Sequence, residues 1–228
     1  MKLDQTDPEY MERLRHFAFV EVTSEEEQQL ESEPRFLAIL AALLGCQSTD
    51  LYRIMLPKAL DSGLSPVAVK EMVYQSTDYL GMGRTWPFLS ITNDILEERG
   101  ISLPLPCQET TTLKNRLEKG AETQAAIFGE QMREAWKKST VNRWLAANCF
   151  GDYYTRTGLT LAQRELITFC ILAAQGGCEP QLMAHIAGNL RLGNTKLFLR
   201  KAVLQCLPYI GYPRSLNAID CIDKVDER

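Results

Sequence analysis

Two stretches of this chain match each other without a gap, at one constant offset that equals the separation between Gly63 and Gly193. The matched residues are glycines and packing residues in the same order: Gly63, Val73, Gln75, Tyr79, Gly81 and Arg84 in the first copy, and Gly193, Val203, Gln205, Tyr209, Gly211 and Arg214 in the second. A constant offset over a whole segment is typical of a duplicated structural unit. We therefore predict two related units, residues 1–99 and 113–228, joined by a connector over residues 100–112.

Helical signals run through both units. Apolar residues recur three or four positions apart, and no window alternates apolar and polar residues as a half-buried strand does. We predict helices over residues 7–20, 36–44, 50–60, 65–79, 86–98 and 113–138, then a turn segment over 150–159, then helices that begin near Thr160 and Pro180. The helix over 113–138 has a potential break at Gly120. The predicted fold class is all-α.

The composition of the chain limits which binding partners and which cellular compartment we expect for it. The chain has 228 residues and a net charge of −4, and no basic block of the kind that binds nucleic acid. No apolar run reaches the length of a membrane span, and the amino terminus lacks the apolar segment of a signal peptide. The seven cysteines never form a Cys-x-x-Cys motif, so we expect reduced thiols in a cytoplasmic protein.

Two polar residues in the second unit are the strongest chemical candidates. Glu165 lies early in an apolar helix that opens with a capping box, and His185 lies on the next helix after a glycine break. A short link between antiparallel helices can bring the two side chains to one cleft. The alternatives are an ion pair of Glu165 with Arg164 or Arg156, and a histidine that only satisfies a helix contact.

The two copies differ at the positions of the candidate reactive residues. At the same constant offset, Glu165 corresponds to Arg35, His185 to Met55 and Cys178 to Ser48. The first copy keeps the glycines and packing residues but lacks the reactive ones. We therefore expect a scaffold half followed by a chemically competent half.

Three segments of the second unit carry a family resemblance: F-G-D-Y-Y-T-R-T-G-L-T-L-A-Q-R-E-L-I-T from Phe150, Q-L-M-A-H-I-A-G-N-L-R-L-G-N-T from Gln181, and Q-C-L-P-Y-I-G-Y-P-R-S-L-N-A from Gln205. With them the chain resembles the carboxymuconolactone decarboxylase family, which includes alkylhydroperoxidase D-type proteins. The resemblance implies two tandem all-α repeats in a ring. Because single-repeat members often form hexamers, a fused pair implies a homotrimer.

The resemblance also implies site residues. The acidic residue and the histidine of the family's site correspond to Glu165 and His185. In the peroxidase branch two cysteines precede the histidine, and here Cys178 and Gln181 occupy those positions. The resolving thiol of that motif is therefore absent, which makes the redox branch the weaker match.

The predicted function is decarboxylation, without a cofactor, of a small anionic lactone or a related acid. His185 would act as general acid and Glu165 would set its protonation state. Arg156 would anchor a substrate carboxylate through paired hydrogen bonds, although a structural turn contact is an equal alternative. A hydroperoxidase that uses Cys178, and a binding or assembly protein without catalysis, are the other two hypotheses. The sequence leaves the identity of the substrate open.

Overall fold

The computed structural model describes residues 3–226, and these residues form helices joined by loops, with no strand among them. The prediction of an all-α fold is confirmed. The helices of the first half are α1 (Leu3–Thr6), α2 (Pro8–His16), the π-helix η1 (Phe17–Glu21), α3 (Val22–Ser24), α4 (Ser32–Gly45), α5 (Thr49–Asp61), α6 (Pro66–Leu80) and α7 (Met82–Glu98). Among all the helices of residues 3–226, none combines the length and apolarity needed to cross a membrane.

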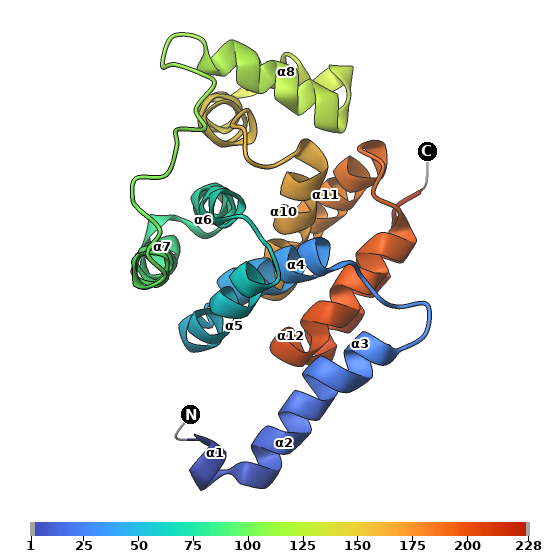
Figure 1. Ribbon diagram of the computed structural model, residues 1–228. Helices are drawn as coiled ribbons and strands as arrows, with labels where there is room; N and C mark the ends of the chain where they lie inside the picture. Colours follow the sequence, from blue (N-terminus) through green and yellow to red (C-terminus); the bar gives the residue numbers. More distant parts are fainter. Residues whose placement is uncertain (1–2, 227–228) are drawn as a thin grey trace.

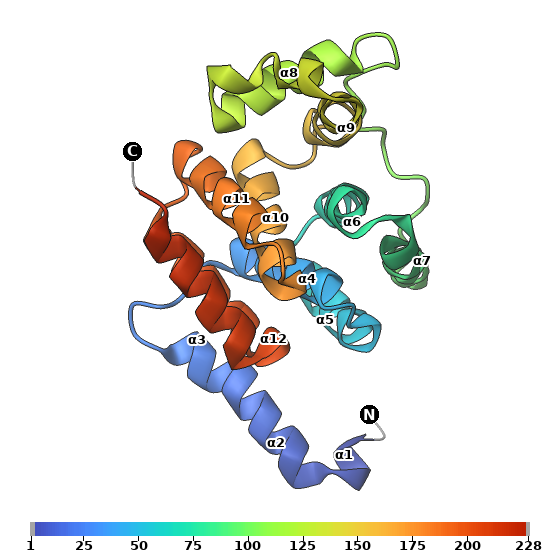
Figure 2. The same cartoon turned by 180° about the vertical axis from the view of Figure 1, so that it is seen from behind.

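The second half continues with α8 (Arg116–Phe128), the short 3-10 helices η2 (Glu130–Met132) and η3 (Ala135–Lys138), α9 (Thr140–Trp144), the π-helix η4 (Leu145–Tyr154), α10 (Leu161–Gln175), α11 (Glu179–Arg191) and α12 (Lys196–Lys224). In Figure 1, α8 lies at one end of the molecule above α10 and α11, whereas α1 to α3 lie at the opposite end beside α12. The reverse view in Figure 2 shows α10, α11 and α12 side by side.

One hydrophobic core joins the two halves. Its centre is α4, in which every residue from Phe36 to Gly45 is buried. A helix that is apolar on all sides can be stable only inside a shell of other helices. Here α10 covers α4 along most of its length, and buried side chains of both halves belong to the same cluster. The predicted units therefore share a core instead of each having one.

Elements of the two halves correspond at the offset found in the sequence. When the first half is shifted so that Gly63 meets Gly193, both bounds of α5 coincide with those of α11, and the start of α6 coincides with that of α12. Gly81 and Gly211 occupy equivalent helix junctions with φ of 78° in both, a backbone conformation that favours glycine. These matches support the predicted duplication, which stays a prediction.

The structure corrects two predicted elements between residues 113 and 159. The helix predicted over 113–138 ends at Phe128, because Gly129 adopts φ of 104° and turns the chain. Gly120 does not break it: a Cβ atom there would lie 1.8 Å from the carbonyl oxygen of Ala146, so glycine permits close packing of α8 on η4. The start of the predicted turn segment, residues 150–154, is helical and belongs to η4.

Candidate active site

Glu165 is held inside the protein by the first turns of α10. Thr160 and Gln163 form the predicted capping box, which satisfies the free backbone N–H groups at the helix start. From Arg164 to Ala174 every residue is buried, and Glu165 has no exposed surface. The carboxylate therefore needs a partner within the protein.

That partner is His185. Glu165 Oε2 lies 2.8 Å from His185 Nδ1, and the two side chains are 0% and 10% exposed. The structure thus brings the two predicted residues together, and Glu165 makes no ion pair with an arginine of the described chain. Since Nδ1 is taken, Nε2 is the ring nitrogen left for chemistry, and it makes no hydrogen bond with a described residue.

Two neighbours of His185 on α11 fix this geometry. Asn189 Nδ2 donates to the backbone carbonyls of both Glu165 and His185, at 2.9 and 2.8 Å, and so ties α10 to α11. Gly188 lies opposite the carboxylate, where a Cβ atom would stand 2.6 Å from Glu165 Oε2. Glycine at this position therefore makes room for the acid.

Aromatic rings hold the imidazole from two sides. The rings of Tyr79 and Phe128 meet that of His185 edge-on, with centroids at 5.5 and 5.3 Å. The Tyr79 hydroxyl is 2.7 Å from that of Tyr154, which in turn lies 2.6 Å from Thr168 Oγ1. Burial holds the pKa of both tyrosines well above the usual range, so the hydroxyls stay neutral.

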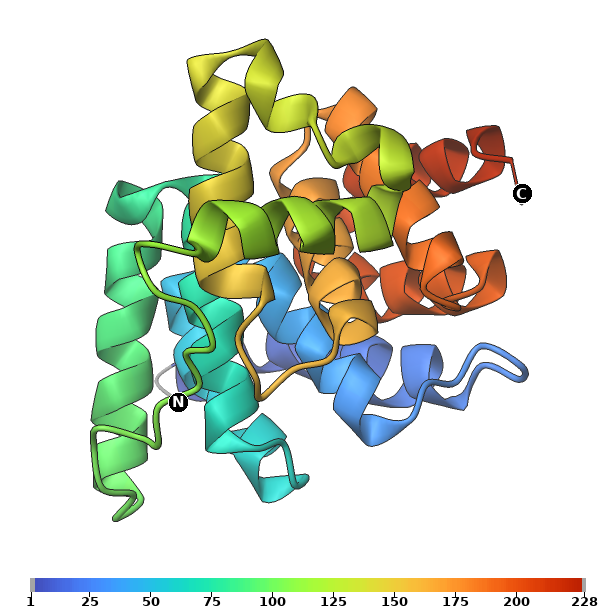
Figure 3. The ribbon, with the colours of Figure 1, turned by 90° about the horizontal axis from the view of Figure 1, so that it is seen from above.

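His185 lines a cavity of about 660 Å³ between α6, α8, η4, α10 and α11. Seen from above in Figure 3, α8 crosses over this part of the molecule. The lining residues are Asp78, Tyr79, Gln124, Phe128, Met132, Leu145, Phe150, Leu172, Gln175, Gly177, Cys178, Gln181, Ala184 and His185. The wall is mainly apolar, with a few polar groups, as is usual for a site that binds a small molecule.

The first half contributes Asp78 and Tyr79 to this wall, which the sequence analysis missed. Because Tyr209 repeats Tyr79 in the second copy, the sequence favours a packing role for Tyr79. The sequence does set Asp78 apart, because the equivalent position of the second copy is occupied by Pro208 and the acid is therefore not part of the repeated pattern. The first half is thus more than a scaffold.

Asp78 is an unusual carboxyl group. Its Oδ2 atom is shielded from solvent and has no hydrogen-bond partner among the described residues. Burial raises the pKa of Asp78 to about 7, although a hydrogen bond with the Cys149 thiol lowers it in part, and the like charge of Asp152 adds to the rise. The group can therefore exchange a proton near neutral pH.

Cys178 lies in the cavity wall at the start of α11, within reach of a ligand. Its thiol donates a weak hydrogen bond to the carbonyl of Leu172, with a sulfur-to-oxygen distance of 3.6 Å. Burial, followed by the charge of Glu179, raises the thiol pKa above its ordinary value. This environment opposes formation of the reactive thiolate.

Arg156 lies outside the cavity lining. Its guanidinium pairs with the carboxylate of Glu71 through contacts of 2.9 to 3.0 Å, and Glu71 also accepts from Arg164 at 3.1 Å. The buried Glu71 is therefore shared by two arginines and joins α6 to the segment before α10. This pairing supports the structural alternative that the sequence left open for Arg156.

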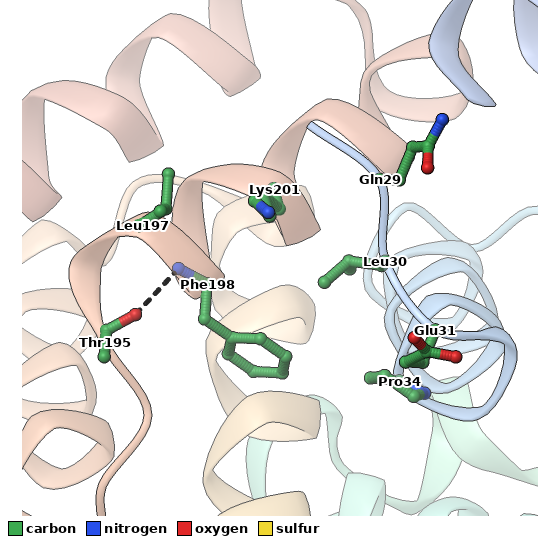
Figure 4. Close-up of a pocket in the computed structure, with 8 residues that line it drawn as sticks. All are labelled: Gln29, Leu30, Glu31, Pro34, Thr195, Leu197, Phe198 and Lys201. Atoms are coloured by element: carbon green, nitrogen blue, oxygen red, sulfur yellow. Dashed lines mark hydrogen bonds between the residues drawn. The ribbon is translucent and has the colours of Figure 1, made fainter. Parts of the chain in front are cut away.

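Another hollow, drawn in Figure 4, lies between the loop before α4 and the first turns of α12. Leu30, Pro34 and Phe198 are among the residues that line it, and Thr195, which also lines it, caps α12. It contains none of the candidate residues, so the cavity at His185 is the candidate active site.

Comparisons with known proteins agree on one family. A sequence profile described as the carboxymuconolactone decarboxylase family matches residues 140–224. The 4-carboxymuconolactone decarboxylase of Acinetobacter baylyi is 27% identical over 118 residues, which are 49% of this chain and 87% of that protein. Both His185 and Glu165 fall within the residues that the profile matches.

The fold has a counterpart among solved structures. A crystal structure of a protein provisionally assigned as a gamma-carboxymuconolactone decarboxylase subunit, from Burkholderia xenovorans, superposes with a TM-score of 0.56. The match covers 95% of this chain and 86% of the other. At 19% identity it shows that the two proteins share a fold, and no more. Residues 140–224 are therefore similar to the carboxymuconolactone decarboxylase family, and the superposition shows that the fold is shared with the solved structure.

Proposed function

We propose that this protein decarboxylates a small carboxylated lactone or a related carboxylic acid without a cofactor. The observation that carries the proposal is the buried hydrogen bond of 2.8 Å between Glu165 and His185 at the wall of a cavity. The family relationship supports the same reaction class.

In the proposed step, the bond between the carboxylate carbon and the substrate ring breaks and carbon dioxide leaves. The electron pair moves through the adjacent double bond, and the far carbon takes a proton from His185 Nε2. Glu165 accepts the Nδ1–H hydrogen bond, which fixes the tautomer and the ring orientation. Solvent later returns the proton, so one substrate anion and one proton give one product and one carbon dioxide.

The cavity supports this chemistry through its wall. Phe128, Phe150 and Leu172 line the same cavity as His185, so a bound carboxylate would exchange water for a largely apolar environment. In such an environment, the loss of a carboxylate's charge becomes more favourable. No arginine or lysine of the described chain lines the cavity, which leaves His185 as the group able to carry positive charge there.

The hydroperoxidase hypothesis has less support. It needs Cys178 as a thiolate, whereas burial raises the pKa of that thiol. It also needs a second thiol, and Gln181 occupies the position where the peroxidase branch has one. Decarboxylation is therefore the better proposal for this cavity.

We also propose that the chain assembles as a ring-forming homotrimer. Leu145, which lines the cavity, and its near neighbours in the sequence Val141 and Trp144 are 42%, 67% and 60% exposed, which is unusual for large apolar side chains so close together. Sedimentation velocity tests this directly, and a monomer over a wide concentration range would rule the trimer out.

A panel of carboxylated lactones and organic hydroperoxides, assayed with the wild type, tests the reaction class. His185→Gln is expected to lower decarboxylation about 100- to 10,000-fold, the usual contribution of a general acid. The exposed His16, the other histidine of the chain, provides the matched control His16→Gln, which should keep full activity. Failure of the wild type to decarboxylate any lactone acid, or full activity of His185→Gln, would overturn the proposal.

A further inference from the structure

The polar atoms of the cavity wall have unmet hydrogen-bonding capacity. Three residues that line it each have a buried side-chain oxygen without a hydrogen-bond partner in the described chain: Asp78 Oδ2, Gln124 Oε1 and Gln175 Oε1. Gln124 is only 3% exposed, yet its Oε1 atom makes no hydrogen bond with a described residue. Buried polar groups are normally satisfied, so these side chains point to a ligand.

No cation of the described chain balances the charge of Asp78. The salt bridges among the described residues do not include it, and the charged group that acts on it most directly is another acid, Asp152. The titratable groups that face it are Cys149, Asp152 and Tyr153 of η4, with His185 of α11 lining the same cavity. No titratable group of α4, α7 or α10, which also pack on α6, acts on Asp78.

An ionised carboxylate in this position would be unfavourable, and it would repel an anionic ligand. Buried acids without a cation usually keep their proton instead. A neutral carboxyl group has an O–H donor, and its hydrogen bond to a ligand carboxylate is of the strong, charge-assisted kind. Protonation of the acid and binding of an anion would then favour each other.

We propose that Asp78 holds a proton when the cavity is occupied and donates a hydrogen bond from its carboxyl group to the carboxylate of a small monoanionic ligand. Gln124 supplies an N–H donor to the same cavity. The ligand class rests on the proposed function, which requires a carboxylate, but the proton on Asp78 does not depend on turnover. Ligand binding is therefore accompanied by uptake of a proton.

Calorimetry with the saturated lactone acid 5-oxotetrahydrofuran-2-carboxylate tests this, because this probe cannot lose carbon dioxide through a double bond. Titrations in buffers of different ionisation enthalpy give the number of protons taken up. With an Asp78 pKa of about 7, the wild type should take up about 0.9 proton at about pH 8 and almost none at about pH 5. Asp78→Asn should bind the probe without this uptake.

Two further variants assign the proton. Asp94→Asn, the same change on the surface of α7, should behave like the wild type. His185→Gln should retain the uptake; if His185→Gln abolishes it and Asp78→Asn does not, the proton belongs to the histidine and the inference is wrong. Absence of probe binding at millimolar concentration would also overturn it.

Infrared difference spectra supply a readout that does not depend on affinity. Addition of the probe at about pH 8 should produce the carbonyl stretch of a protonated carboxyl group, and Asp78→Asn should lack that band. A wild type that takes up the proton but turns over no lactone acid would support this inference and refute the proposed function. Turnover of a lactone acid without Asp78-dependent proton uptake would support the proposed function and refute this inference.

Discussion

The carboxylate of Glu165 and the imidazole of His185 share a hydrogen bond of 2.8 Å at a place where Glu165 has no contact with solvent. The bond uses Nδ1, so Nε2 is the ring nitrogen that would transfer the proton in the proposed reaction. Asn189 anchors the backbones of both residues and keeps the distance short. Proton transfer by His185 should therefore depend on Glu165 although the acid itself need not touch the substrate.

Replacement of Glu165 by Gln tests this dependence. The amide can keep the shape of the contact, but it removes the charge that orients and stabilises a protonated imidazole. We expect kcat to fall about 100-fold or more with a smaller change in KM, since substrate contacts remain. The exposed Glu98 offers the control Glu98→Gln. An unchanged kcat would mean that Glu165 has only a structural role.

Gly188→Ala should displace the Glu165 carboxylate, because the new Cβ would stand 2.6 Å from Oε2 and 3.0 Å from Ile127 Cγ2. We expect a loss of about 1–3 kcal/mol in the free energy of unfolding, together with a marked fall in kcat. Gly83→Ala in α7 is the matched control, since nothing lies within 4 Å of its Cβ position. Equal effects of the two variants would contradict the proposed packing role of Gly188.

Cys178→Ser should leave decarboxylation intact. In the wild type the raised pKa of the Cys178 thiol predicts slow alkylation by iodoacetamide at neutral pH, with a rate that still climbs at about pH 9. Peptide-level mass spectrometry measures this, with the exposed Cys107 as the internal comparison. Rapid alkylation of Cys178 that is independent of pH would indicate a thiolate and revive the hydroperoxidase hypothesis.

Asp78 should make stability depend on pH. Its pKa rises from 3.8 to about 7 on folding, so the folded state holds a proton that the unfolded chain has lost. The free energy of unfolding should therefore decrease as pH rises from about 4 to about 7, and then level off. Asp78→Asn should remove this slope and gain up to about 4 kcal/mol relative to the wild type above pH 7. Chemical denaturation at several pH values measures it, and parallel curves for both proteins would contradict the prediction.

Local signals in the sequence predicted most of the fold. The capping box at Thr160, the proline at position 180 and the glycines after the helices all act over a few residues, and the structure has them as expected. The π-helix η4 escaped prediction because Gly151, which looks like a turn residue, serves close packing: a Cβ there would lie 2.1 Å from the carbonyl oxygen of Arg116.

The candidate site was predicted only where its residues lie on neighbouring helices. Glu165 and His185 belong to one helix pair, so sequence spacing was enough. Asp78 and Gln124 reach the cavity from α6 and α8, and no local pattern links them to His185. The pairing of Arg156 with Glu71 could not be predicted either, because the two residues lie 85 positions apart and no local pattern connects them.

The placement of α4 at the centre of the core limits how this protein can be divided. A polypeptide that starts at residue 113 would lose the helix that covers α10, and the apolar side of α10 would meet water. It would also lose the wall that carries Asp78 and Tyr79. We therefore expect a shortened chain that keeps the Glu165–His185 pair to aggregate instead of acting as a minimal enzyme.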